Sequence, residues 1–441
     1  MKKIINKIFQ ISFALGLTIN QGNTQTLPEF ISTALANNYQ IRILKNNERI
    51  ASNNDAWGNA GLLPTVSLSG GISTAFNNTR QEFSSGDFQE GKNAQTGNIN
   101  LSALANWTVF DGFGVYARKE QLEHLYQQGQ VLTKFYIEQT IADIAAAYYQ
   151  LVYQEKLLKN FKSSLSISNY RYSLEKRKRE VGTGTEMSFN QALVDYKTDS
   201  IRFLAQTNLI TTLELEIKRI LGIDLNSEIT ITQKSFDFAI PPHKDSLLAS
   251  IKSNSYQLES AAIDELIAEA QIRIEKANRY PTIDVYGGYQ FAQSNAEVGF
   301  ISLNRNRGPV LGLNINFNLF DGGNVNRAIA NAKISKENAE ITHNDIRQNI
   351  TAEGLTQYEL YHSLLKRINL ARENVSATST VFEIAKKQLE QGSINAYDFR
   401  LVQLTLINAE SSLLEQEYLL KLAEINLNRI VGGALATYYA E

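Results

Sequence analysis

The chain has 441 residues, and its 43 basic and 45 acidic side chains nearly cancel to a formal net charge of −2. This balance gives no indication of nucleic-acid binding, so no nucleic-acid partner is expected. Cysteine is absent, which excludes disulfides, thiolate metal sites, a cysteine nucleophile and a lipid anchor on an N-terminal cysteine.

The N-terminal segment has the features of a secretory signal peptide. Lys2, Lys3 and Lys7 form a basic region, and a mostly apolar run from Ile8 to Ile19 follows it. That run is shorter than the roughly 20 residues that a membrane-spanning helix needs, so a membrane anchor is the less favoured interpretation. A polar stretch continues to Thr26, and residues 1–26 are assigned to the signal peptide and this stretch. No later run is apolar and long enough for a transmembrane helix.

The first half of the remaining chain alternates between helical and strand-like patterns. Residues 27–60 have the apolar spacing of a helix, and Pro64 ends it. Residues 66–73 then alternate between apolar and small polar side chains, which predicts a strand. A polar, glycine-rich stretch from Asn77 to Gly97 is expected to be a loop, and a second alternating strand follows to Val109.

A long helix is predicted from Gly114 to Val181, because this stretch contains no proline. Its apolar residues are spaced like the seam of a coiled coil, and at this length the helix would span about 100 Å. The seam residues are Ile137, Ile141, Ile144, Tyr148 and Leu151. After a glycine-rich turn, a second helix is expected from about Glu186 to Leu221, ending at Gly222. Residues 223–244 form a connector, with a short strand suggested at 229–232.

The second half repeats this pattern. Phe110-Asp111-Gly112 recurs as Phe320-Asp321-Gly322, and in both copies an alternating pattern stops where a helical one starts. A carboxylate at this position can accept the free backbone N–H groups of a helix N-terminus, so both aspartates are interpreted as structural caps. A second strand pair and a second long helix are expected on either side of Asp321.

Further matches extend the duplication over both halves. Asn37 and Tyr39 match Asn254 and Tyr256 at an offset of 217, whereas later matches, such as Gly182 with Gly392, have an offset of 210. A first strand–strand connection seven residues longer than the second explains the change of offset. The expected divisions after the signal region are a first repeat, a connector, a second repeat and a C-terminal tail at 27–222, 223–244, 245–433 and 434–441.

The faces of the predicted strands bear on their surroundings. From Leu311 to Leu319, apolar residues lie on one face, and glycine and asparagines on the other. A soluble sandwich would also alternate, but four strands are few for a sandwich, and a membrane barrel turns its apolar face to lipid. Four strands cannot close a barrel, so several copies must combine. Aromatic residues that could anchor such strands at the membrane interface are Trp107, Tyr289 and Phe291.

The duplicated helix–Pro–strand–strand–Phe-Asp-Gly–long-helix units, with glycine turns at Val181-Gly-Thr183 and Gln391-Gly-Ser393, resemble the TolC-like outer-membrane efflux protein family. The resemblance covers essentially the whole mature chain. It implies a mixed α and β fold, mainly α, with four transmembrane β-strands and long periplasmic helices in each chain. It also implies a homotrimer, in which the strands form one shared twelve-stranded β-barrel and the helices form an α-barrel. The connector and the C-terminal segment would belong to a belt around the helical barrel.

The resemblance also assigns functional positions. In the family the helix–turn–helix tips meet a periplasmic adaptor (membrane fusion) protein, which links the channel to an inner-membrane pump. The matching residues are Val181, Gly182, Thr183, Gln391, Gly392 and Ser393. Family members often carry two acidic residues after the second glycine, which form a cation-sensitive periplasmic gate. Asp398 matches the first, whereas Leu401 occupies the second position. A helix cap or first-turn acid is the alternative interpretation of Asp398.

The function that the resemblance implies is an exit duct in the outer membrane for a tripartite efflux pump, exporting small molecules to the outside. One alternative is the outer-membrane component of a type I protein-secretion system, and a different class is a secreted coiled-coil scaffold without a pore. An enzyme is not expected, because no nucleophile–base pair appears and the four histidines are scattered. For the same reason no cofactor or metal site is expected. The basic run Lys176–Arg179 is interpreted as a solvated helix face or, alternatively, as a contact with the adaptor or the inner-membrane surface.

Overall fold

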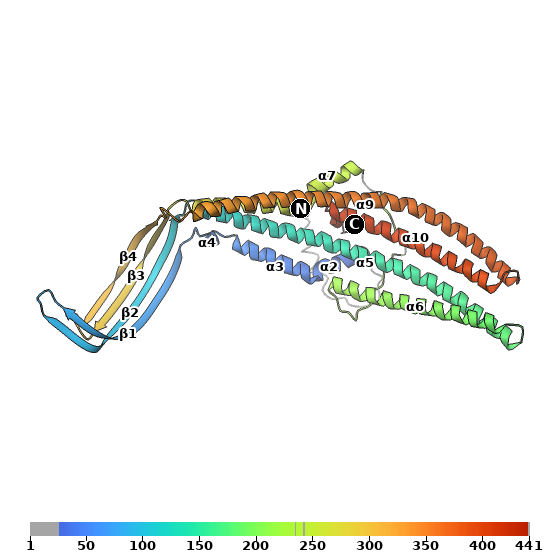
Figure 1. Ribbon diagram of the computed structural model, residues 1–441, viewed down its shortest axis with the longest axis horizontal. Helices are drawn as coiled ribbons and strands as arrows, with labels where there is room; N and C mark the ends of the chain where they lie inside the picture. Colours follow the sequence, from blue (N-terminus) through green and yellow to red (C-terminus); the bar gives the residue numbers. More distant parts are fainter. Residues whose placement is uncertain (1–25, 234, 241–242, 440–441) are drawn as a thin grey trace. The chain divides into compact units, whose positions relative to one another are not determined.

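The computed structural model describes residues 26–233, 235–240 and 243–439 (Figure 1). The predicted signal peptide and polar stretch at 1–26 lie outside the described residues except for Thr26, as do Pro241 and Pro242 of the connector. The chain divides into two compact units. Over the described residues, the first unit comprises residues 26–46, 131–233, 235–240, 243–259 and 344–439, and the second comprises residues 47–130 and 260–343.

Helices dominate the described part of the chain, and their order follows the predicted repeat. Their bounds are α2 (Leu27–Asn37), α3 (Tyr39–Asn54), α4 (Trp57–Ala60), α5 (Gly114–Glu180), α6 (Glu186–Leu221), α7 (Lys244–Asn254), α8 (Tyr256–Ala277), α9 (Asn324–Glu390), α10 (Ala396–Ile430) and α11 (Ala434–Tyr439). The two long helices, α5 and α9, each contain 67 residues. Over the described residues, no helix is long and apolar enough to cross a membrane.

The prediction of one helix over residues 27–60 is wrong, because Asn38 interrupts it. Its backbone leaves the helical region, and its side-chain Oδ1 accepts hydrogen bonds from the N–H groups of Gln40 and Ile41 at 2.9 and 3.2 Å. Asn38 Nδ2 also donates to the carbonyl of Ile220 at 3.0 Å. The asparagine thus ends α2, starts α3 and contacts α6. A second break separates α3 from α4 at residues 55–56.

The predicted second helix of the first half is confirmed. Thr185 caps α6 by accepting a hydrogen bond from the N–H of Ser188 at 3.1 Å. Gly222 ends the helix with a positive φ of 66°. This left-handed conformation suits glycine, which has no Cβ to clash.

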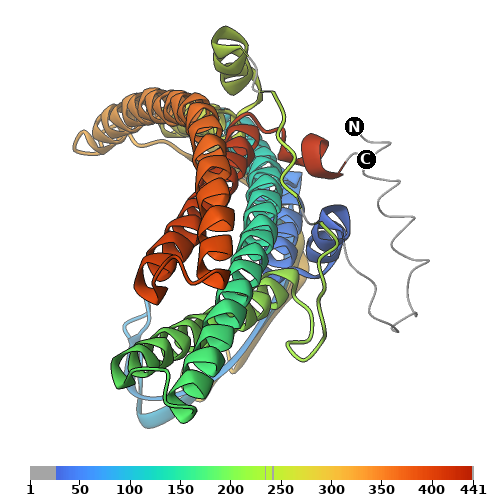
Figure 2. The same ribbon diagram turned by 90° about the vertical axis from the view of Figure 1, so that its right-hand side faces the viewer.

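The predicted coiled-coil seam lies in the core of the first unit. Four seam residues of α5, Ile141, Ile144, Tyr148 and Leu151, are at most 2% exposed, and Ile137 is partly buried against them. Phe30 and Ile31 of α2 and Leu221 of α6 belong to the same cluster. A second cluster joins α7, α9 and α10 through Leu247, Leu364 and Leu420. Figure 2 views this unit toward the turns of its two helical hairpins, α5–α6 and α9–α10.

The second unit contains one antiparallel sheet in the order β1-β2-β3-β4 (Figure 1). The strands are β1 (Thr65–Glu82), β2 (Phe88–Phe110), β3 (Thr282–Ala296) and β4 (Leu303–Asn316). The predicted loop over residues 77–97 is wrong, because most of it extends the β1–β2 ladder beyond a bulge between Asn77 and Thr79. This extension has few apolar residues, so its sequence lacks the alternation by which strands are recognised. The strand suggested at 229–232 is reduced to a single bridge at Ile231.

Both Phe-Asp-Gly motifs form the predicted switch from strand to helix. Asp111 Oδ1 accepts from the N–H of Val115 at 3.1 Å, and Asp321 Oδ2 accepts from the N–H of Val325 at 2.7 Å. The two aspartates thus cap the long helices α5 and α9. Only Asp111 also pairs with an arginine, Arg118, whose Nε donates to the carbonyl of Ala60 at 2.9 Å.

This difference predicts unequal effects of removing the two caps. Asp111→Ala should destabilise the protein by about 1 kcal/mol through loss of the cap alone, and further through loss of the Arg118 pair. Asp321→Ala should have a smaller effect, because its carboxylate accepts hydrogen bonds from the backbone of Gly323 and Val325 but pairs with no arginine among the described residues. Thermal unfolding midpoints of the two variants check this order. Equal shifts, or a larger shift for Asp321→Ala, would contradict it.

Candidate functional site

The sheet has one apolar and one polar face. Directly paired residues point to the same side of an antiparallel sheet, so the register assigns each residue to a face. The exposed apolar side chains of one face are Val66, Leu68 and Ile72 of β1, Leu101 and Trp107 of β2, Tyr289 of β3, and Leu311, Leu313 and Ile315 of β4. Leu68, Ile72 and Leu311 are each more than 80% exposed. A water-soluble protein rarely exposes such a continuous apolar patch.

The opposite face is mainly polar. It carries Ser67, Ser69 and Ser73 of β1, Asn98, Asn100 and Ser102 of β2, Gln290 and Ser294 of β3, and Asn304, Asn306 and Asn314 of β4. On this face two side-chain hydrogen bonds add to the backbone ladder, one between the hydroxyls of Ser69 and Ser102 at 2.6 Å and one from the Thr108 hydroxyl to Asp284 Oδ1 at 2.6 Å. In a soluble sandwich the apolar face packs inside and the polar face meets water. In a membrane barrel the apolar face would instead point outward to lipid and the polar face inward.

The apolar band crosses the sheet diagonally. The register places Val66, Ala105, Gly287 and Leu311 in one row. On β1 the band begins at Val66 and continues away from the helical end of the strand, whereas on β4 it continues past Leu311 toward the helical end. Strands that are tilted in a membrane would show this diagonal shift, because the flat apolar layer would meet each strand at a different row of paired residues.

Both outer strands of the sheet have a free edge. Among the described residues, β1 pairs only with β2, and β4 pairs only with β3. An open edge leaves backbone N–H and C=O groups without partners, which is costly in lipid. The interior of the sheet is closely packed by comparison, since a Cβ on Gly288 would lie 2.0 Å from the carbonyl oxygen of Ala103. A glycine inside a strand is typical of a place where two backbones approach this closely.

The six predicted tip residues form two matching turns. Gly182 and Gly392 have positive φ values of 79° and 74°. In each turn the next residue, Thr183 or Ser393, donates its N–H to a helix carbonyl five residues earlier at 2.9 Å. These bonds satisfy carbonyls at the ends of α5 and α9, as in a Schellman motif. Val181 and the other tip residues are exposed, so their side chains are accessible.

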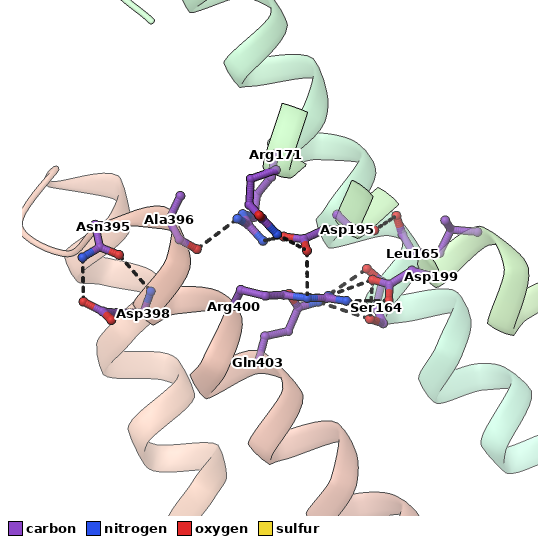
Figure 3. Close-up of polar contacts among 12 residues, drawn as sticks. Ser164, Leu165, Arg171, Asp195, Asp199, Asn395, Ala396, Asp398, Arg400 and Gln403 are labelled. Atoms are coloured by element: carbon purple, nitrogen blue, oxygen red, sulfur yellow. Dashed lines mark hydrogen bonds and ion pairs between the residues drawn. The ribbon is translucent and has the colours of Figure 1, made fainter. Parts of the chain in front are cut away.

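Asp398 lies in the first turn of α10. Asn395 caps this helix by accepting from the N–H of Asp398 at 2.9 Å, and Asn395 Nδ2 donates to Asp398 Oδ2 at 2.7 Å (Figure 3). Asp398 is exposed, as is Leu401, which occupies the position of the second family acid. Asp398 therefore fits the alternative interpretation of a first-turn acid, although its carboxylate remains accessible.

A buried ion cluster, which the sequence interpretation missed, joins three helices close to this turn. Arg400 of α10 binds both carboxylate oxygens of Asp199 of α6, at 2.7 and 2.8 Å (Figure 3). Asp195 of α6 accepts from Arg171 of α5 at 3.1 Å, and Arg171 also donates to the carbonyl of Ala396 at 2.9 Å. The Arg400 and Asp199 side chains are only 9% and 2% exposed.

Two neutral side chains complete the cluster. Ser164 of α5 donates to Asp199 Oδ2 at 2.9 Å, and Arg400 donates to Gln403 Oε1 at 3.1 Å. The cluster thus attaches the second hairpin to the first through groups that burial makes costly to leave unpaired. The sequence did contain a signal for this cluster. Asp195 and Asp199 share the helical spacing of Phe189 and Ala192, so two acidic residues fall on the buried face of α6.

The environment keeps Asp199 ionised. Burial alone would raise the pKa of this carboxyl, but the hydrogen bonds and charge of Arg400, with a further bond from Ser164, hold it below its ordinary value. Burial lowers the pKa of the Arg171 guanidinium, and the charge of Asp195 opposes that effect. An arginine keeps its charge nevertheless.

The lowered pKa of Asp199 predicts how stability depends on pH. A carboxyl with a depressed folded-state pKa contributes stability above its unfolded pKa of about 3.9, and the contribution is lost as pH falls through the folded value. The unfolding midpoint of the wild type should therefore exceed that of Asp199→Asn by a constant amount from about pH 8 to about pH 5, and the difference should narrow only below about pH 4. A difference that already disappears between neutral pH and pH 5 would contradict the assignment. Glu359→Gln, at an exposed pair with Lys244, serves as the control.

Comparison with known proteins agrees with this geometry. The family model described as "Outer membrane efflux protein" matches residues 30–223 and 247–433. The toluene efflux pump outer membrane protein TtgC and the antibiotic efflux pump outer membrane protein ArpC, both of Pseudomonas putida, are each 19% identical over 408 residues, covering 92% of this chain and 83% of theirs.

Solved structures show the same fold. The Campylobacter jejuni CmeC outer membrane channel has a TM-score of 0.77 at 14% identity, over 97% of this chain and 92% of its own. The Vibrio cholerae outer membrane protein VceC has a TM-score of 0.73 at 16% identity, over 92% of this chain and 96% of its own.

Proposed function

This chain belongs to the outer membrane efflux protein family, and from that premise we propose that three copies join into one duct that carries small molecules out of the cell. The observation that carries the proposal is the sheet, which is apolar on one face, polar on the other and unpaired at both edges. Three such sheets, each joining its β1 edge to the β4 edge of the next, would make a closed twelve-stranded barrel with asparagine and serine lining the channel. Closure would satisfy the backbone groups that lipid cannot.

The helices support the same assembly. On α6, Met187, Val194 and Ile201 recur every seven residues and are 83%, 56% and 68% exposed. A seven-residue apolar repeat on an exposed helix face is typical of a coiled-coil contact. We assign this face to a neighbouring copy of the chain, as part of an α-barrel of long periplasmic helices.

Small molecules are the proposed cargo class. The curated relatives export toluene and antibiotics, and the polar channel face offers hydrogen-bonding groups with little charge. The duct would be passive. Opening would come from rearrangement of the helical hairpins, driven by a partner pump in the inner membrane. Export of a polypeptide by the reconstituted complex would instead favour a protein-secretion component.

Extraction and conductance test the duct. The protein should leave membranes only with detergent, migrate as a trimer and produce stepwise ion conductance in planar lipid bilayers. A monomer that stays in solution without detergent and gives no conductance would exclude the duct and favour a scaffold without a pore.

The tips are proposed to contact a periplasmic adaptor protein. Because the chain lacks cysteine, a single introduced thiol is unique. Thr183→Cys and Ser393→Cys should crosslink to the adaptor in a working complex, whereas Thr212→Cys, at an exposed position within α6, should not. Failure of both tip positions in a complex that still exports its cargo would contradict the contact.

Asp398 is proposed as a gate residue. In a trimer three copies of this exposed carboxylate would gather near the helical hairpin turns, where they would attract multivalent cations. Asp398→Asn should relieve block of the conductance by a trivalent cation added from the helical side. Unchanged block would leave Asp398 only as an acid in the first turn of α10.

A further inference from the structure

Two arginines interrupt the apolar face of β4. Arg307 lies directly opposite Phe291, and Arg305 opposite Gln293, so both belong to the face that carries Leu311 and Leu313. Both are exposed. A charged residue on a lipid-facing strand is costly at the middle of a bilayer and much less so at the interface. Their place along the strand therefore decides what they can do.

The arginines lie at the end of β4 away from the helices. The chain leaves β4 at Asn316 and enters α9 at Asn324, so the strand end near Asn316 is the helical end. Toward the other end, the outward positions of β4 change from apolar at Leu311 to charged at Arg307 and Arg305. Because the helices extend into the periplasm, this end of the strand reaches the outer leaflet of the membrane.

The guanidinium groups of Arg305 and Arg307 have N–H donors that are not already bound to a carboxylate. In the part of the chain that the structure describes, the Arg305 side chain donates only through its Nε, to Gln293 Oε1 at 3.0 Å. Over the described residues, the side chain of Arg307 forms no ion pair or hydrogen bond, and neither arginine side chain pairs with a carboxylate. The situation of Arg80 is different, because it pairs with Glu90 of the neighbouring strand at 2.9 Å.

We propose that Arg305 and Arg307 bind the phosphate groups of anionic glycolipid in the outer leaflet. The guanidinium fork matches phosphate geometry and can make two parallel hydrogen bonds. The long aliphatic stems can lie along the apolar band while the charged heads reach the interface. The Gln293 bond would hold Arg305 across the strands and leave its two terminal nitrogens for the lipid. This inference rests on the proposed function, because it needs the apolar face to contact lipid.

Lipid binding by the purified full-length trimer tests the inference. Wild type, Arg305→Gln/Arg307→Gln and the control Arg327→Gln/Lys333→Gln, which removes two exposed charges from α9, would be titrated in zwitterionic detergent. The probes are bis-phosphorylated lipid A and its dephosphorylated form, with binding followed by native mass spectrometry. The sheet variant should bind the phosphorylated lipid roughly 25-fold more weakly, about 5-fold for each arginine near an anionic lipid surface, while the control should bind as wild type does.

Each outcome decides the question. Wild-type protein that binds phosphorylated and dephosphorylated lipid equally overturns the proposal, whatever the variants do. So does a sheet variant that binds as tightly as the control, and so does full displacement of the lipid by millimolar inorganic phosphate, which would indicate a site for free anions. Conductance of the wild type separates this result from the duct itself, since a conducting trimer without phosphate preference retains the proposed function and loses only the lipid site.

Discussion

Replacing Arg400 with methionine is expected to destabilise the helical hairpins by about 3–5 kcal/mol, the range for breaking one side of a buried ion pair. The change would leave Asp199, which is 2% exposed, as a buried carboxylate without its arginine partner. The loss should be concentrated near the turns, because Arg400 and Arg171 hold α10 against α5 and α6. Limited proteolysis of the α9–α10 hairpin and the thermal unfolding midpoint both measure it.

Two variants separate this effect from a general loss of charge. Arg372→Met removes a half-exposed arginine that pairs with Glu417 at 3.3 Å, and a surface pair of this kind contributes little. Arg400→Leu combined with Asp199→Leu removes both charges, so much of the lost stability should return. If the double variant is no more stable than Arg400→Met, packing rather than the unpaired carboxylate accounts for the loss.

The same cluster bears on gating. If the channel opens by movement of one hairpin relative to the other, the Arg171–Ala396 and Arg400–Asp199 contacts must break. If the two hairpins move together, these contacts can stay intact. If they break, Arg400→Met should conduct more often than wild type in planar bilayers, and if the hairpins move together, conductance should stay unchanged. The structure thus shows which side chains connect the two hairpins, and a sequence pattern alone does not show this.

The sequence predicted the elements better than their ends and their pairing. Apolar spacing found α5 and α6 nearly to the residue, because both helices bury a regular seam and end at glycine. It missed the break at Asn38, because that break is stabilised by a hydrogen bond from the Asn38 side chain to Ile220, which is distant in the sequence. Residues 77–97 were misread because their ladder is polar on both faces.

The candidate site was predictable only where a local motif encodes it. The glycine turns are local, and Gly182 and Gly392 adopt the conformation that their neighbours require. The ion cluster depends on Arg400 meeting Asp199 across 201 positions of sequence, and no local pattern specifies such a meeting. The face assignment of Arg305 and Arg307 likewise needed the register with β3.

A second large effect is expected from placing a charge on the apolar face of the sheet. Leu313→Arg should cost about 2–4 kcal/mol in each chain, the range for arginine near the bilayer middle on a lipid-facing strand. Leu313 is 57% exposed, lies opposite Val285 and is within the apolar stretch of β4. The expected result is loss of the proposed trimer and little protein in the outer membrane fraction.

The neighbouring residue provides the matched control, because successive strand side chains point to opposite faces. Asn314 is exposed and lies opposite Asp284 on the polar face. Asn314→Arg adds the same charge at nearly the same depth, so the trimer should assemble, and the added positive charge should shift the channel toward anions in bilayer recordings. If instead Asn314→Arg abolishes the trimer while Leu313→Arg assembles, the faces are reversed and the barrel as proposed is wrong. If both assemble equally well, the sheet does not contact lipid on either face, and a soluble scaffold becomes the better explanation of the exposed apolar band.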